Sequence, residues 1–120
     1  LRLSPSHPLV TSSRSLVVRA ERTKLAGNDA FRSRNYPQAV DLYTAALAGV
    51  EQTGNTSFRG VLHSNRAAAY MALFKYREAL ADCTSALKMD SHHVKARLRR
   101  ARCFVELEET DAAIRDFQQA

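Results

Sequence analysis

The chain of 120 residues has no tryptophan, two cysteines, three prolines and four glycines. Two cysteines are too few for a disulfide framework or a four-cysteine zinc site, and Cys83 and Cys103 lie too far apart for C-x-x-C redox chemistry. No apolar run approaches the roughly 18 residues that cross a bilayer, so no membrane association is expected. The low glycine and proline content excludes collagen-like and low-complexity chains. We therefore expect a folded protein of a reducing compartment, the cytoplasm.

Motifs for catalysis and for cofactor binding are also missing from the sequence. It has no glycine-rich phosphate loop, no nucleophile elbow and no cluster of metal ligands. The adjacent His92 and His93 would point about 100° apart on a helix, so they make a poor chelate and are expected at a helix N-terminus or on the surface. Cys83 and Cys103 fall at core positions and are expected to be buried packing thiols. We predict a protein that is not an enzyme and holds no cofactor or metal.

Residues 1–15 differ in composition from the rest of the chain. They are rich in serine, proline and arginine, and no acidic residue precedes Glu21. This composition is typical of a disordered linker. It is also that of a transit peptide, which would target the chain to an organelle, but a first residue other than methionine favours a segment of a longer protein. We assign 1–15 to a linker and 16–120 to one small domain with a single core.

Small residues recur in register through the rest of the sequence. Ala39, Ala79 and Ala113 are 40 and then 34 residues apart, and another small residue precedes each of them by twelve places. A 34-residue unit with this spacing is typical of tetratricopeptide repeats, in which each unit is a pair of antiparallel helices. The small residues lie where two helix axes approach closely. We expect repeats at about 20–53, 60–93 and 94–120.

The predicted fold class is all-α, a right-handed solenoid of three helix pairs. Six helices are expected, at 16–33, 37–52, 57–73, 76–89, 92–107 and 110–119. Pro37 fits a first helical turn and Gly54 a left-handed position. The later helices are expected to begin with N-caps at Thr56 or Ser57, at Asp90 or Ser91, and at Thr110. The last helix is expected to be truncated and to lack a capping helix, which would leave an apolar flank for self-association or for a further helix.

Five polar side chains are predicted to converge on the concave groove, which the first helix of each unit lines. They are Lys24, Asn28, Asn65, Lys95 and Arg99. Lys24 and Asn28 are four residues apart, as are Lys95 and Arg99, so the members of each pair project side by side from one helix face. Apart from the two amide oxygens, these side chains offer only hydrogen-bond donors. Such a site fits carboxylates, and a peptide that ends in an acidic residue offers two of them close together.

Further groove positions extend this predicted site. Four apolar positions are expected to contact an aliphatic side chain of the ligand, upstream of its C-terminus. They are Phe31, Met71, Leu98 and Val105. Arg102 lies one turn beyond Arg99 and either extends the site or pairs with Glu106, four residues on. Arg100 is expected to pair with acids of an adjacent helix, and Arg97 to face solvent.

Three motifs carry a resemblance to a known family: Lys24-x-x-x-Asn28, the run Ser64-Asn65-Arg66-Ala67-Ala68-Ala69-Tyr70, and Lys95-x-x-x-Arg99. They resemble the dicarboxylate clamp of tetratricopeptide co-chaperones such as the heat-shock organising protein, and the match covers about residues 20–120. The resemblance implies binding of the C-terminal Glu-Glu-Val-Asp tail of cytosolic heat-shock chaperones of the seventy and ninety classes. It implies that Lys24, Asn28 and Asn65 hold the terminal carboxylate, and that Lys95 and Arg99 hold the last aspartate side chain. The segment 94–104 is also similar to DnaJ-type co-chaperones, although the sequence contains no His-Pro-Asp triplet.

Two alternatives fit parts of the composition. A net charge of +6 and the arginines within 95–102 would suit a basic helical scaffold for RNA or for other acidic peptides. Groove aromatics that stack on bases are nearly absent, Phe31 being the one candidate, so nucleic-acid binding is disfavoured. The second alternative treats the five polar side chains as ordinary solvated helix surface, and their joint occurrence at groove positions in three units disfavours it.

Overall fold

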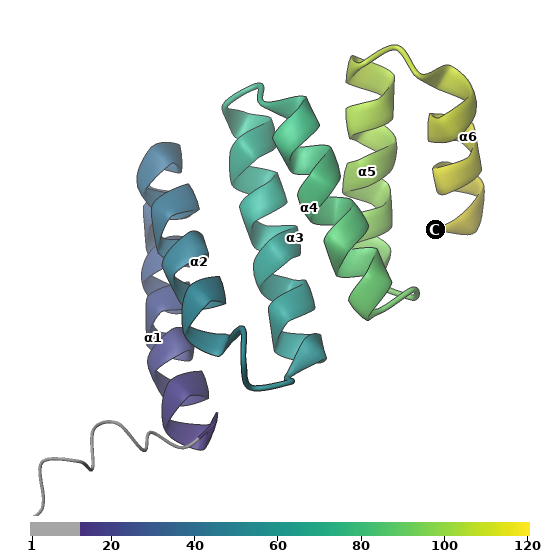
Figure 1. The fold of residues 1–120 in the computed structure, drawn as a ribbon. Helices are drawn as coiled ribbons and strands as arrows, with labels where there is room; N and C mark the ends of the chain where they lie inside the picture. Colours follow the sequence, from purple (N-terminus) through teal and green to yellow (C-terminus); the bar gives the residue numbers. More distant parts are fainter. Residues whose placement is uncertain (1–12) are drawn as a thin grey trace, which may run out of the picture.

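The computed structural model describes residues 13–120, which form six α-helices arranged as three antiparallel pairs (Figure 1). The helices are α1 (Ser13–Arg32), α2 (Tyr36–Val50), α3 (Thr56–Ala72), α4 (Tyr76–Met89), α5 (Val94–Glu106) and α6 (Thr110–Gln119). Each helix packs on its pair partner, α2 packs on α3 and α4 on α5, and α3 also contacts α5. The predicted all-α class with three helix pairs is confirmed.

The helix boundaries lie within three residues of those expected from the sequence. The largest difference is at the start of α1, which begins at Ser13, so residues 13–15 are helical and do not belong to a linker. Leu16 and Val17 are half-buried, and they extend the apolar face of α1 towards its N-terminus. Residues 1–12, the rest of the predicted linker, lie outside the described part of the chain.

The turns before α2 and α3 are closed by asparagine caps. The Asn35 side chain accepts a hydrogen bond from the backbone N–H three residues on, and Pro37 lies in the first turn as predicted. Asn55 caps α3 in the same way at 3.1 Å. The predicted caps at 56–57 are therefore wrong, because these residues already lie inside α3. Gly54 has a φ of +73° and so adopts the predicted left-handed conformation.

The caps of α5 and α6 also differ from the prediction. His93 Nδ1 accepts a hydrogen bond at 3.3 Å from the backbone N–H three residues on, which makes His93 the N-cap of α5. Asp90 instead accepts from the N–H of His92 at 2.9 Å, two residues on, and closes the turn that leads to the helix. Glu109 occupies the cap position of α6 without a side-chain hydrogen bond, and Thr110 is the first helical residue.

The core lies between the helices of each pair and between successive pairs. The three register residues Ala39, Ala79 and Ala113 are at most 2% exposed. In the first pair, Gly27 of α1 faces the buried ring of Tyr43 of α2, and a Cβ at position 27 would come within 2.7 Å of that ring. The small residues thus permit the close helix approach that the repeat spacing predicted.

Asp82 of α4 links the two helices of the second pair. Its buried carboxylate accepts two hydrogen bonds of 2.7 Å from the Arg66 guanidinium of α3. His63 Nδ1, on the same face of α3, lies 2.9 Å from Asp82 Oδ1. A buried carboxylate with two basic neighbours fixes the relative position of the two helices.

Asp116 of α6 repeats this arrangement in the third pair, 34 residues further on. Arg100 of α5 donates two hydrogen bonds to it, at 2.7 and 2.8 Å, which confirms the predicted partner of Arg100. The prediction that Arg97 faces solvent is wrong. Its side chain is only 14% exposed, lies 3.5 Å from Asp116 and donates to Gln119 and to the backbone carbonyl of Ser91.

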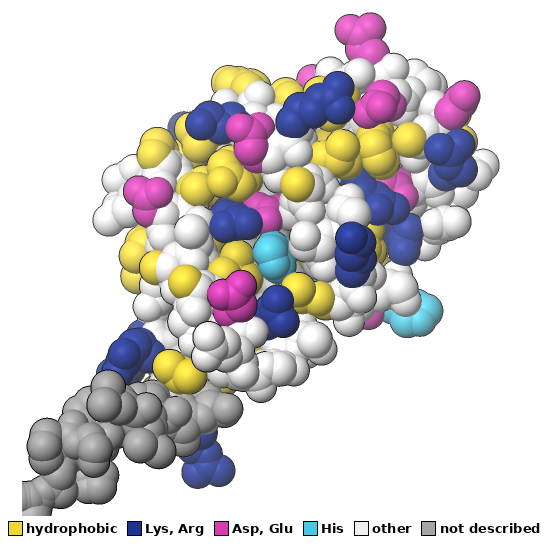
Figure 2. Space-filling model, viewed as in Figure 1, with side chains coloured by type: hydrophobic (Ala, Val, Ile, Leu, Met, Phe, Trp, Pro, Cys, Tyr) yellow, Lys and Arg dark blue, Asp and Glu magenta, His cyan; other side chains and the backbone are white. Residues whose placement is uncertain are grey.

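The surface mixes charge of both signs with apolar side chains. On the face seen in Figure 2, lysines and arginines are interspersed with aspartates and glutamates, and apolar side chains lie between them. Ile114 and Phe117 of α6 remain about half exposed, at 48% and 47%, and form an apolar flank at the end of the stack. Across residues 13–120, no helix combines the length and the apolar character that a membrane span requires.

Candidate peptide-binding groove

Two adjoining hollows are lined mainly by α1, α3 and α5, the first helices of the three pairs. The first hollow, of about 150 Å³, is lined by Asn28, Phe31, Arg32, Tyr43, Asn65, Ala68 and Arg99. The second hollow, of about 320 Å³, is lined by Ala68, Met71, Ala72, Tyr76, Arg99, Arg102 and Glu106. Because Ala68 and Arg99 line both, the two hollows are adjacent, and we refer to them together as the groove.

The amide of Asn28 is oriented by two hydrogen bonds within the first hollow. Its Oδ1 accepts from the Tyr43 hydroxyl at 2.5 Å and from Asn65 Nδ2 at 3.4 Å. Burial raises the pKa of Tyr43, and the nearby cations Arg32 and Arg99 oppose this less strongly, so the hydroxyl stays protonated and donates at neutral pH. With its oxygen engaged, Asn28 offers the hollow its Nδ2 donor.

Arg99 is anchored to α3 and presents a charge to both hollows. Its Nη1 donates to the backbone carbonyl of Ser64 at 2.9 Å and to the Ser64 hydroxyl at 2.7 Å. The remaining N–H groups of the guanidinium have no hydrogen-bond partner among residues 13–120. Burial lowers the pKa of Arg99, but a guanidinium ordinarily titrates so far above neutrality that it stays charged. A held cation with free donors is suited to a carboxylate.

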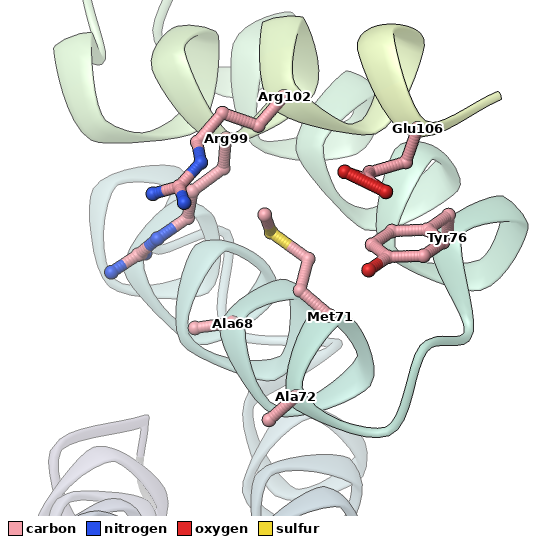
Figure 3. A pocket seen from close by; sticks show the side chains of 7 residues that line it. All are labelled: Ala68, Met71, Ala72, Tyr76, Arg99, Arg102 and Glu106. Atoms are coloured by element: carbon pink, nitrogen blue, oxygen red, sulfur yellow. The ribbon is translucent and has the colours of Figure 1, made fainter. Parts of the chain in front are cut away.

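The second hollow has an apolar floor between charges of opposite sign. Figure 3 shows the Met71 side chain in the middle, with Arg99 and Arg102 together on one side. Glu106 lies on the other side, close to the ring of Tyr76. No ion pair joins Arg102 to Glu106 within the described chain, so of the two expectations for Arg102 the pairing with Glu106 is not realised.

Four of the predicted groove residues line neither hollow. Lys24 lies one turn before Asn28 on α1, pairs with Glu21 at 3.2 Å, and places its Nζ 5.5 Å from the Phe58 ring centroid. Lys95 is exposed on α5, one turn before Arg99, and Leu98 and Val105 of the same helix are 39% and 51% exposed. Lys24 and Lys95 therefore flank the groove on its two outer helices. The pair between Lys24 and Glu21 is a partly exposed surface ion pair, which is typically worth less than about 1 kcal/mol.

Several groove residues were not found from the sequence. Tyr43 is one of them, although a tyrosine hydroxyl at a buried position needs a hydrogen-bond partner, which is a signal for a polar contact. Tyr76 and Glu106 carry no sequence signal for a place in the groove. Among residues 13–120, no three His, Cys, Asp or Glu side chains gather where they would hold a metal ion.

Sequence comparison relates this chain to helical-repeat proteins of the chaperone system. Residues 70–119 match the family model described as tetratricopeptide repeat. The chain is 35% identical over 119 residues to the human DnaJ homolog subfamily C member 7, which covers 99% of this chain. It spans only about a quarter (24%) of the length of that relative.

Two solved structures with bound peptides are similar in fold. The second TPR of Spaghetti (RPAP3), bound to the HSP90 peptide SRMEEVD, is 33% identical with a TM-score of 0.76, and the match covers 83% of this chain and 87% of that one. The second TPR domain of human RPAP3, in complex with the HSP70 peptide SGPTIEEVD, is 34% identical with a TM-score of 0.74, and the match covers 84% and 79%. In both cases the similarity extends over most of each domain.

Proposed function

The chain belongs to the tetratricopeptide-repeat family and is related to the TPR domains of co-chaperones, and from this we propose that its groove binds the C-terminal carboxylates of heat-shock chaperones. The single observation that carries the proposal is the convergence of Asn28, Asn65 and Arg99 on one hollow, contributed by three different helices. The domain is a non-catalytic binding module. By joining its parent protein to a chaperone in the cytosol, it acts as an adaptor.

The terminal main-chain carboxylate of the peptide is assigned to Asn28, Asn65 and Lys24. Asn28 contributes its Nδ2, because its oxygen already accepts from Tyr43 and Asn65. Lys24 adds a positive charge. To do so it leaves its ion pair with Glu21 and binds the carboxylate of the ligand instead. Hydrogen bonds to an ionised group contribute about 1.5–3 kcal/mol each, so this end of the peptide supplies much of the affinity.

The side chain of the last aspartate is assigned to Arg99 and Lys95. Arg99 is already held by Ser64, so little side-chain freedom is lost when the ligand binds. Lys95 has no ion pair in the described chain and reaches the ligand from the exposed edge of α5. The ligand's upstream residues then lie over Phe31 and Met71, with Leu98 at the rim and Arg102 beside the acidic residues.

Titration of a fluorescent SRMEEVD peptide into single-residue variants tests the proposal. Asn65→Ala and Lys95→Ala should each weaken binding by about 1–3 kcal/mol, which is roughly 5- to 150-fold, because each removes a donor to a carboxylate. Lys88→Ala is the matched control, since Lys88 is an exposed lysine in the last turn of α4. Circular dichroism of each variant checks that the fold is retained. If both groove variants bind as tightly as Lys88→Ala does, the carboxylate assignment is wrong.

A further inference from the structure

Glu106 has no ion-pair partner among residues 13–120, and it lies in a groove otherwise rich in cations. It lines the second hollow across the floor from Arg99 and Arg102. We propose that Glu106 makes the groove select chaperone tails that carry a basic residue immediately before the apolar residue and the acidic terminus. This inference rests on the proposed function, and it names the class of tail that the same groove prefers.

The three charged residues follow one another along α5 at intervals close to one helical turn. From Arg99 to Glu106 the helix rises about 10 Å, since each residue adds 1.5 Å. An extended peptide advances about 3.3 Å per residue, so a ligand that runs along α5 with its last aspartate at Arg99 passes Arg102 with its valine and is level with Glu106 at the glutamate three residues from its end. The apolar residue and the residue before it then lie about 3 and 6 Å beyond Glu106. A long basic side chain at that point reaches back to the Glu106 carboxylate.

The order of charges in the groove matches one of the two bound peptides seen in similar domains. SRMEEVD has its acidic residues at the C-terminus, then methionine, then arginine. SGPTIEEVD has the same acidic end and an apolar isoleucine, but threonine in place of the arginine. Arg99 and Arg102 complement the acidic end of both peptides. Only the first peptide offers a partner of opposite charge to Glu106.

Glu106 is available for such a contact because Arg102 does not neutralise it. The two residues are four apart on α5, the spacing at which glutamate and arginine commonly pair, yet Figure 3 shows Arg102 turned towards Arg99. Glu106 therefore also repels glutamates of the ligand and helps to fix the register of the peptide. Its exposed position makes the expected discrimination modest, about two- to fivefold, the range for an exposed ion pair.

A double-mutant cycle between protein and peptide tests this proposal. Wild type and Glu106→Gln are titrated with SRMEEVD and with a peptide in which glutamine replaces the arginine. Wild type should bind the arginine peptide about two- to fivefold more tightly, and Glu106→Gln should bind the two peptides equally. Glu106→Arg should reverse the preference. Glu51→Gln is the matched control, because it removes the same charge at the exposed end of α2 and should keep the wild-type preference.

The outcomes separate this inference from the proposed function. If wild type binds both peptides tightly but without preference, or if Glu106→Gln retains the preference, the role of Glu106 is overturned while the carboxylate clamp stands. If neither peptide binds wild type, both proposals fail. If the preference of wild type for the arginine peptide weakens in high salt, this supports an ion pair between Glu106 and the arginine. A preference that does not depend on salt would contradict that ion pair.

Discussion

Replacement of Gly27 by alanine should destabilise the domain even though alanine favours helices. Gly27 lies in α1, and a Cβ there would be 2.7 Å from Cε1 and 2.9 Å from Cδ1 of Tyr43. Carbon atoms in contact prefer about 3.5–4.0 Å, so the ring would have to move by most of an ångström. Tyr43 is 2% exposed and its hydroxyl donates to Asn28. It has little room to move without breaking that hydrogen bond.

The expected magnitude for Gly27→Ala follows from three opposing contributions. Alanine gains about 1 kcal/mol of helix propensity over glycine. Overpacking a buried site costs about 1–3 kcal/mol, and loss of the hydrogen bond between Tyr43 and Asn28 costs about 1 kcal/mol. The net loss of unfolding free energy is about 1–3 kcal/mol. Gly49 provides the control, because a Cβ there meets nothing within 4 Å, so Gly49→Ala should stabilise by about 0.5–1 kcal/mol.

Urea unfolding followed by circular dichroism measures both variants against wild type. The two glycine-to-alanine changes should shift the unfolding free energy in opposite directions. Gly27→Ala should also weaken peptide binding, because the adjacent Asn28 loses the contact that orients its amide, whereas Gly49→Ala should leave binding unchanged. If Gly27→Ala is as stable as Gly49→Ala, the close contact between α1 and Tyr43 does not exist in solution.

Three further predictions concern buried polar groups. Tyr43→Phe should weaken binding of SRMEEVD roughly two- to tenfold by releasing the Asn28 amide; unchanged affinity in the titration would contradict this role. Asp82→Asn should lower the unfolding free energy by about 2–4 kcal/mol in urea, because it removes the charge that two basic side chains share; a loss below 1 kcal/mol would refute the importance of this link. The hydrogen bond with Cys103 and burial raise the pKa of Cys83, so the unfolded chain loses this proton at lower pH. Stability should therefore fall as the pH rises above about 9, and it should fall less in Cys83→Ala.

The helix pairs were predictable because close helix packing leaves a strong pattern in the sequence. Only small residues fit where two axes approach, so Ala39, Ala79 and Ala113 fix the register of three units. The convergence of Asn28, Asn65 and Arg99 on one hollow followed from that register, since each lies on the first helix of its unit. The helix caps were less predictable, because several neighbouring polar residues have similar cap energies and the loop geometry decides between them.

The contacts between partner helices were harder to predict than the helices themselves. Arg97 was expected to face solvent, because the position of a residue on one helix does not reveal which acid the next helix presents. The 34-residue spacing that relates Asp82 to Asp116 also relates Arg66 to Arg100, and this repeat of an acid and a base was a usable signal. The orientation of Glu106 away from Arg102 leaves no trace in the sequence, because it depends on rotamers within the groove.

The central claim is that donors from three helices grip the free carboxyl end of a partner chain. The most direct test is a titration of wild type with SRMEEVD that carries a free C-terminus and with the same peptide amidated at its C-terminus, at one ionic strength. The free acid should bind at least about tenfold more tightly, because amidation removes a charged acceptor worth about 1.5–3 kcal/mol. Equal affinity for the two peptides would contradict the claim.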